Sequence, residues 1–180
     1  MTARAGAADN PPDFEPRLPF RLAVLRPAEA LEMLRWRYAP PYDGYNAALA
    51  PGSAEEAEAV SRCLDPALRF VALRSGGALI GFASFGEDGR VTGGAYEEDA
   101  LDIGLGLRPD LTGRGIGARV IARVIEHGLM TWQPAALRVT IAAFNTRAQR
   151  AWARAGFVER SQFVTSDGRA FVIRLRKGSA

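Results

Sequence analysis

The sequence contains almost no lysine, histidine or cysteine, and these shortages exclude several common chemistries. Among 180 residues, Lys177 is the only lysine, His127 the only histidine and Cys63 the only cysteine. A Walker-type phosphate loop and a Schiff-base site each need a lysine inside the domain, and structural zinc needs several Cys or His ligands. One cysteine also excludes an internal disulfide and fits a reducing cytoplasm. We therefore expect no metal site and a cytoplasmic location.

Long hydrophobic runs are also missing, since no stretch approaches the roughly 20 apolar residues that span a bilayer. Residues 1–19 are rich in Ala, Pro and acidic side chains and lack the apolar segment of a signal peptide. We expect a flexible tail over 1–19, a single domain over 20–177 and no membrane partner. The arginines are scattered and the net charge is only +3, so a nucleic-acid partner is unlikely. Arginine in place of lysine, with abundant Ala and Gly, suggests a GC-rich bacterial genome.

Apolar periodicity and turn signals predict an α/β (α+β) domain with a mixed sheet flanked by about four helices. Strands are predicted over 20–25, 69–74, 78–85, 100–107, 137–143, 157–163 and 170–176. Helices are predicted over 27–35, 53–63, 117–130 and 146–155. The helix over 53–63 should begin at Ser53, because Glu56 follows it at the spacing of a capping box.

A glycine-rich turn lies between the strand over 100–107 and the helix after it. Gly113, Gly115 and Gly117 alternate there, with Arg114 between the first two. A turn whose backbone amides must approach a ligand keeps such glycines, because side chains would block the approach. The following helix would direct its unpaired N–H groups and positive dipole end at the same spot. The pattern therefore predicts a phosphate-binding turn.

The strand before this turn has one unusual face. Alternation places Asp102, Gly104 and Gly106 on one face and the apolar residues 101, 103, 105 and 107 on the other. A bare strip that leads from a carboxylate to a phosphate site could hold a long phosphorylated ligand. Alternatively, the glycines make room for a neighbouring helix. The G-x-G-x-G spacing differs from the dinucleotide fingerprint G-x-G-x-x-G.

Two motifs together resemble the GNAT superfamily of acetyl-CoA-dependent N-acetyltransferases. The segment 112–117, TGRGIG, resembles the loop that binds the coenzyme A pyrophosphate in that family. The segment 138–157, a strand followed by Asn145, Ala148, an aromatic residue and Gly156-Phe157, resembles the second family signature. The resemblance covers nearly the whole chain. It implies a mostly antiparallel sheet that splays apart at its central strands.

The resemblance also implies a cofactor and the residues that bind it. The cofactor would be acetyl-CoA, with its pantetheine arm on strand backbone, its pyrophosphate on turn amides and a further contact from an asparagine. The residues at the matching positions are Leu105, Leu107, Gly113, Arg114, Gly115, Ile116, Gly117 and Asn145.

Catalytic residues follow less directly from the resemblance. Asp102 matches the position where many members place a general base, and a carboxylate relay would help an ammonium lose its proton. Alternatively, Asp102 caps a turn or orders a water molecule. Trp152 stands where many members have a tyrosine that protonates the leaving thiolate, and an indole cannot act as that acid. Water, Tyr45 or Tyr96 could supply the proton instead.

An aromatic, proline-rich loop over 36–46 is the best candidate for recognition of the acceptor. Its aromatic side chains could stack on a substrate or bind a cation, or could form a small hydrophobic core of their own. The residues concerned are Trp36, Tyr38, Tyr42 and Tyr45.

The sequence thus predicts an N-acetyltransferase that moves an acetyl group from acetyl-CoA directly to a primary amine of a small molecule or peptide. One alternative is an acyl-CoA sensor without turnover, because of Trp152. Another alternative is an RNA- or ribosome-associated modifier of protein N-termini, and this hypothesis rests only on the small excess of basic over acidic residues. A homodimer is possible.

Overall fold

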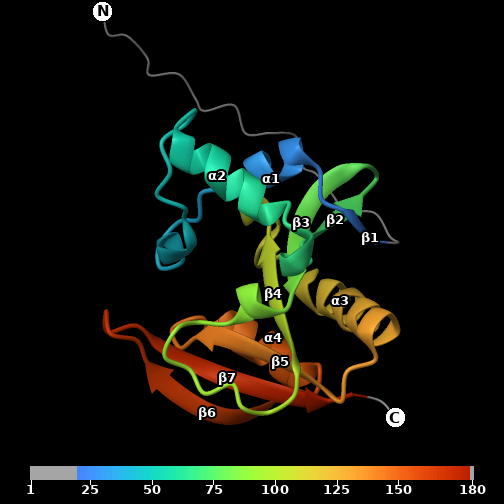
Figure 1. The fold of residues 1–180 in the computed structure, drawn as a ribbon. Helices are drawn as coiled ribbons and strands as arrows, with labels where there is room; N and C mark the ends of the chain where they lie inside the picture. The colour runs from blue at the N-terminus through green and yellow to red at the C-terminus, as the bar shows by residue number, and fades with distance from the viewer. Residues whose placement is uncertain (1–19, 179–180) are drawn as a thin grey trace, which may run out of the picture.

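One seven-stranded sheet runs through the computed structural model, which describes residues 20–178 (Figure 1). Its strand order is β1-β2-β3-β4-β5-β7-β6, and every neighbouring pair is antiparallel except β4 and β5. The strands are β1 (Arg21–Val24), β2 (Val71–Ser75), β3 (Ala78–Phe85), β4 (Leu101–Leu107), β5 (Ala136–Ala142), β6 (Val158–Val164) and β7 (Ala170–Lys177).

Four α-helices flank this sheet: α1 (Pro27–Leu34), α2 (Ala54–Cys63), α3 (Gly117–Trp132) and α4 (Thr146–Arg154). Pro27 starts α1 with its fixed φ, and the Ser53 hydroxyl caps α2 by accepting from the Glu56 amide at 3.1 Å. Within residues 20–178, no helix has both the length and the apolar character needed to cross a bilayer.

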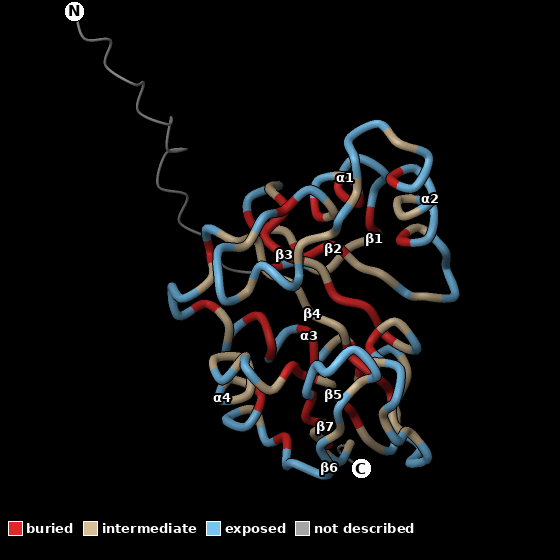
Figure 2. The backbone as a smooth tube through the Cα atoms, turned by 90° about the vertical axis from the view of Figure 1, so that its left-hand side faces the viewer, coloured by how far each residue is buried: buried red, intermediate tan, exposed pale blue. Residues whose placement is uncertain are grey.

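The sheet separates two hydrophobic clusters, and β2 shows how. Leu73 belongs to the larger cluster, which includes the buried face of α3 and Trp152 of α4. Its neighbour Ala72 belongs to the smaller cluster with Met33 of α1 and Cys63 of α2. Successive strand residues face opposite sides, so α1 and α2 cover one face and α3 and α4 the other. Figure 2 shows the buried segments concentrated around the central strands.

The sheet opens between its two central strands. β4 pairs with β5 only through Leu101–Leu137 and Asp102–Arg138, whereas β5 pairs with β7 over its full length. Beyond Asp102 the two strands diverge, and β4 continues beside β3 alone. Figure 1 shows β1–β3 with α1 and α2 as one group, and β5–β7 with α4 as another.

These observations confirm the predicted fold class and its splayed central strands. The seven strands and four helices lie within two residues of their predicted ends. The predicted tail over 1–19 lies outside the described residues.

Candidate active site

A single cavity of about 740 Å³ passes through the opening between β4 and β5. Its walls include residues 103–107 of β4 and 139–142 of β5. On one side of the sheet it reaches Met33 of α1 and the loop over 36–46, and on the other it reaches α3 and α4. The cavity therefore connects the two faces of the sheet, with a different set of side chains at each end.

At one end lies the glycine turn that the sequence predicts as a phosphate site. Gly113 and Gly115 have φ of 81° and 79°, a left-handed backbone that side chains rarely adopt. A Cβ added at Gly115 or Gly117 would have no atom within 4 Å, so the backbone there is open to a ligand. Helix α3 begins at Gly117 with no side-chain cap and no acidic residue in its first turn. This combination suits an anion.

Three arginines of α4 add positive charge at the same end. Arg147, Arg150 and Arg154 all line the cavity, because spacings of three and four residues place them along one helix face. The Arg147 guanidinium also lies 3.7 Å from where a Cβ would stand on Gly113.

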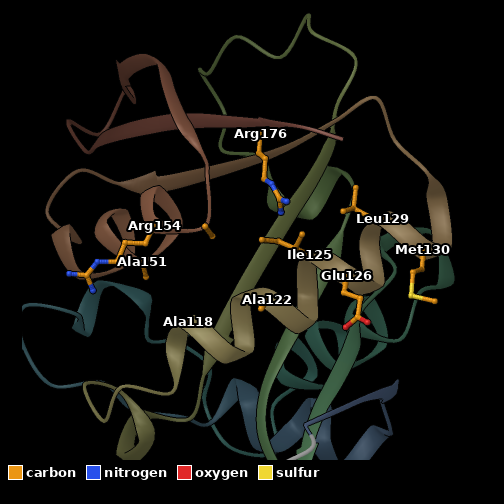
Figure 3. A pocket seen from close by; sticks show the side chains of 10 residues that line it. Ala118, Ala122, Ile125, Glu126, Leu129, Met130, Ala151, Arg154 and Arg176 are labelled. Carbon is orange, nitrogen blue, oxygen red and sulfur yellow. The ribbon is translucent and has the colours of Figure 1, made fainter. Parts of the chain in front are cut away.

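The groove between α3 and α4 extends the cavity at this end. A hollow of about 570 Å³ lies there and shares Ala118, Ala151 and Arg154 with the cavity. Figure 3 shows Arg176 pointing into this hollow from the C-terminal strand β7. An elongated ligand therefore has a continuous path from the β4–β5 opening to the outer surface of these helices, past Arg154, Arg176 and Glu126.

The backbone of β4 presents hydrogen-bonding groups to the cavity. The Asp102 carbonyl accepts from the Gly86 amide just after β3, and the Arg108 amide donates to the Ile80 carbonyl of β3. Alternation therefore directs the backbone groups of Leu105 and Leu107 away from β3 and into the opening. The Tyr38 hydroxyl donates to the Leu107 carbonyl at 2.7 Å. Burial raises the pKa of Tyr38 to about 12, so the hydroxyl stays protonated as a donor.

The bare strip expected on the other face of β4 is filled, which corrects that part of the sequence analysis. A Cβ on Gly106 would lie 2.3 Å from the Phe82 ring, and one on Gly104 would lie 2.3 Å from the Ser84 hydroxyl. The antiparallel register places both side chains directly across from these glycines. The glycines therefore accommodate side chains of β3, and the 3₁₀ turn that follows β3 also approaches Gly104, where a Cβ would lie 3.8 Å from the Gly89 Cα.

Asp102 forms the centre of a buried charge cluster at the point where β4 and β5 part. Arg138 contacts both of its oxygens at 2.6 and 2.8 Å, and Arg90 donates to Oδ2 at 2.8 Å. Asp102 and Arg138 are each 1% exposed. The Tyr96 ring lies against both guanidiniums, with its centroid 5.4 Å from Arg90 and 4.9 Å from Arg138. We name Arg90, Tyr96, Asp102 and Arg138 the vertex cluster.

This geometry favours a structural role for Asp102. Both carboxylate oxygens are engaged by guanidinium groups, and Asp102 is not among the residues that line the cavity. Removing a carboxylate from such a cluster would leave Arg138 buried without its counter-ion. The general-base role stays a prediction that no contact among the described residues supports.

The aromatic loop closes over the cavity and reaches the cofactor end. Asn145 caps α4 by accepting from the Ala148 amide at 3.0 Å, and its amide nitrogen donates to the Tyr45 hydroxyl at 3.1 Å. The Arg147 guanidinium stands 4.3 Å from the Tyr42 ring centroid. Two residues predicted for different ligands, Asn145 and Tyr45, are thus in direct contact.

Each predicted aromatic residue lines the cavity, and some also pack on their neighbours. Trp36 is 9% exposed and lies against Phe82, with ring centroids 6.1 Å apart. The Asn46 side chain exchanges hydrogen bonds with the Tyr38 backbone at 2.7 and 3.1 Å. The two interpretations of this loop, small core and cavity wall, therefore both apply. Asn46, which the sequence analysis missed, fixes Tyr38 in place.

The sequence offers Tyr45 and Tyr96 as proton donors, and the structure places them differently. The Tyr96 hydroxyl is bonded to both backbone groups of Val91 and to Thr140, and Tyr96 does not line the cavity. The Tyr45 hydroxyl lines the cavity and accepts from Asn145, so its own proton can be donated. Burial raises the pKa of Tyr45, which keeps that proton in place at neutral pH.

Sequence and structure comparisons agree with this geometry. The model of the acetyltransferase (GNAT) family matches residues 29–157. No curated protein matches the chain in sequence.

Several solved structures share the fold at low identity. A chimera of Vibrio cholerae spermidine N-acetyltransferase SpeG with hSSAT is 16% identical, with a TM-score of 0.70 over 88% of this chain and 95% of that one. AAC(6')-Ib with ribostamycin and coenzyme A is 18% identical, with a TM-score of 0.68 over 88% and 93%. The putative acetyltransferase yncA from Salmonella typhimurium, solved with acetyl-CoA, is 13% identical, with a TM-score of 0.62 over 89% and 94%.

Proposed function

Because the chain belongs to the GNAT family of acetyltransferases, we propose that it binds acetyl-CoA in the β4–β5 opening and transfers the acetyl group to a primary amine. The observation that carries this proposal is that the two ends of one continuous cavity have different linings. Its α3–α4 end has the glycine turn and three arginines, and the end beside α1 has an aromatic wall. Two of the similar structures hold acetyl-CoA or coenzyme A.

The residues present fit this cofactor. The amides of residues 113–117 and the start of α3 would hold the pyrophosphate, with Arg147, Arg150 and Arg154 as counter-ions. The outward-facing backbone groups of Leu105 would pair with the amides of the pantetheine arm. The groove between α3 and α4 would take the nucleotide end of the molecule.

Acetyl-CoA supplies the acetyl thioester, and the chain positions an amine against it. The amine must lose one proton, because its pKa lies near 10 and only the neutral form attacks. That proton passes to solvent. The nitrogen then forms a bond to the carbonyl carbon as the carbon–sulfur bond breaks, and it releases a second proton to solvent as the amide forms. The thiolate takes a proton, for which we propose the Tyr45 hydroxyl, since Trp152 has no acidic proton. The vertex cluster holds the two diverging strands at a fixed separation.

A sensor that binds acetyl-CoA without turnover is the alternative that one observation favours. Trp152 lines the cavity but is only 5% exposed and packs edge-on against Phe157, with ring centroids 4.8 Å apart. The usual position of the acid is therefore occupied by a packed indole without an acidic proton. This alternative requires that no other group protonate the thiolate.

One pair of measurements separates these functions. Calorimetric titration of acetyl-CoA tests binding, and thiol release over a panel of amines and N-terminal peptides tests turnover. The proposal expects both. Binding without thiol release for any amine would favour the sensor, and no binding of acetyl-CoA would refute both.

A further inference from the structure

The charged groups of the cavity are distributed unequally between its two ends. Among its described lining residues, Asp88 is the only acid, and the bases are Arg90, Arg147, Arg150 and Arg154. The last three lie on α4 at the phosphate end. Asp88 lies at the opposite end, in the 3₁₀ turn η3 (Glu87–Gly89) that follows β3.

The turn η3 is packed tightly onto the sheet, and this fixes Asp88. A Cβ added to Gly89 would lie 3.0–3.1 Å from backbone atoms of Ile103 and Gly104, so η3 rests directly on β4. Asp88 is thereby held beside the place where β4 enters the opening. Its side chain is 25% exposed, which leaves it partly desolvated and still accessible.

The present ion pairs leave Asp88 available to a ligand cation. Arg90, the neighbouring base, is already paired with Asp102 at 2.8 Å. The partner of Asp88 is Arg62, at 3.8 Å and with 69% of its side chain exposed. Such a long, solvated pair contributes little stability, so an ammonium group can replace Arg62 at small cost.

Asp88 can also be reached from outside. A second hollow of about 400 Å³ shares Asp88, Arg90 and Val91 with the cavity. An acceptor entering through it would meet Asp88 before the opening between the strands.

From this arrangement we infer that Asp88 binds the ammonium group of the acceptor, and that the acceptor is a monocationic primary amine with an apolar or aromatic body. The apolar residues that line the cavity on the α1 side of the sheet include Met33, Trp36 and Phe82, which suit such a body. Inside the cavity, a polycation would have to place each further ammonium near Arg90 or against these apolar groups. The other acid within its reach is Glu87, which lines the outer hollow. Burying an unpaired charge in that way is unfavourable. This inference rests on the proposed function and narrows its substrate class.

The test uses the full chain with acetyl-CoA and two acceptors, 2-phenylethylamine and spermidine. We expect kcat/KM to be about tenfold or more higher for 2-phenylethylamine. In Asp88→Asn the KM for 2-phenylethylamine should rise about tenfold or more, because a charge-assisted hydrogen bond is lost. The KM for acetyl-CoA should stay within about twofold. Glu58→Gln removes the same charge from an exposed side chain of α2 that lines neither the cavity nor the two hollows, and should change neither KM by more than about twofold.

Two results would overturn the inference and leave the proposed function intact. One is a preference for spermidine, and the other is an unchanged KM for 2-phenylethylamine in Asp88→Asn. A titration of 2-phenylethylamine into the protein saturated with coenzyme A measures acceptor binding without turnover, and should show the same loss in Asp88→Asn. Absence of thiol release with every amine would instead count against the proposed function.

Discussion

The two ends of the cavity differ in how they are built. The cofactor end is made from one continuous stretch, β4 with the glycine turn and the start of α3, and from α4 beside it. The acceptor end is assembled from two stretches, α1 with the loop over 36–46 and β3 with η3, which lie farther apart in the sequence than the two stretches of the cofactor end. The cofactor end uses backbone groups and repeated arginines, which suit the binding of a common cofactor. The acceptor end uses single side chains in fixed positions, on which the choice of a particular acceptor depends.

The vertex cluster joins the two ends, and its removal should have the largest effect. Asp102→Ala leaves Arg138 buried without a counter-ion, so we expect a loss of about 3–5 kcal/mol in the free energy of unfolding. The thermal midpoint should fall by on the order of 10 °C, as measured by calorimetry. Arg90→Ala, which removes a more exposed partner, should cost less. If Asp102→Asn kept the wild-type midpoint and lost kcat, Asp102 would be the base after all.

Charge removal on α4 should affect the cofactor end alone. In the double variant Arg150→Ala/Arg154→Ala, we expect the KM for acetyl-CoA to rise roughly 10- to 100-fold, because charge-assisted contacts to phosphate are lost. Added salt should narrow the difference from wild type. Arg21→Ala/Arg160→Ala, which removes two charges from exposed side chains of β1 and β6 outside the cavity and both hollows, is the control for net charge. A comparable rise in the KM for the amine would show that the two ends are not separate.

Tyr45 tests the boundary between the ends. We expect Tyr45→Phe to lower kcat roughly 10- to 30-fold, since a thiol pKa near 8.5 makes protonation at neutral pH worth about 2 kcal/mol. Tyr96→Phe should leave kcat within about twofold, because that hydroxyl lies outside the cavity. Steady-state rates at saturating acetyl-CoA measure both. Equal rates for Tyr45→Phe and wild type would assign the proton to water.

The smallest effect is a pH dependence confined to the acceptor end. Arg35 and the Gly52 amide hold the pKa of Glu56 at about 2, below its usual 4.5. Because the pKa is depressed in the folded state, this pairing stabilises α1 against α2 above about pH 4.5 and is lost as pH falls through about 2. Thermal midpoints measured between pH 7 and pH 2 should therefore fall further for wild type than for Glu56→Gln. Parallel curves would contradict the assignment.

The cofactor end could be predicted from the sequence because its signals are local. Alternating glycines and the Asn145 signature are readable without knowledge of the fold, and the family they indicated is confirmed. Arg147, Arg150 and Arg154 were missed, although their helical spacing was a signal once α4 was placed. Cytoplasmic location, bacterial origin, the flexible tail and a homodimer stay predictions.

The acceptor end could not be predicted because it depends on register and packing. The glycine strip appeared bare until the β3–β4 register placed Phe82 and Ser84 across it. Asp102 appeared free until the short parallel pairing brought Arg138 to it from 36 positions away. No sequence motif marks Asp88 as a residue of the cavity, because its position depends on the packing of Gly89 against β4.

Calorimetric titration of acetyl-CoA into wild type and into Arg150→Ala/Arg154→Ala tests the central claim most directly, that the β4–β5 opening has a cofactor end built from the glycine turn and α4. We predict one molecule bound per chain, with affinity at least about tenfold weaker in the variant. Absence of binding to wild type, or equal affinity in the variant, would contradict it.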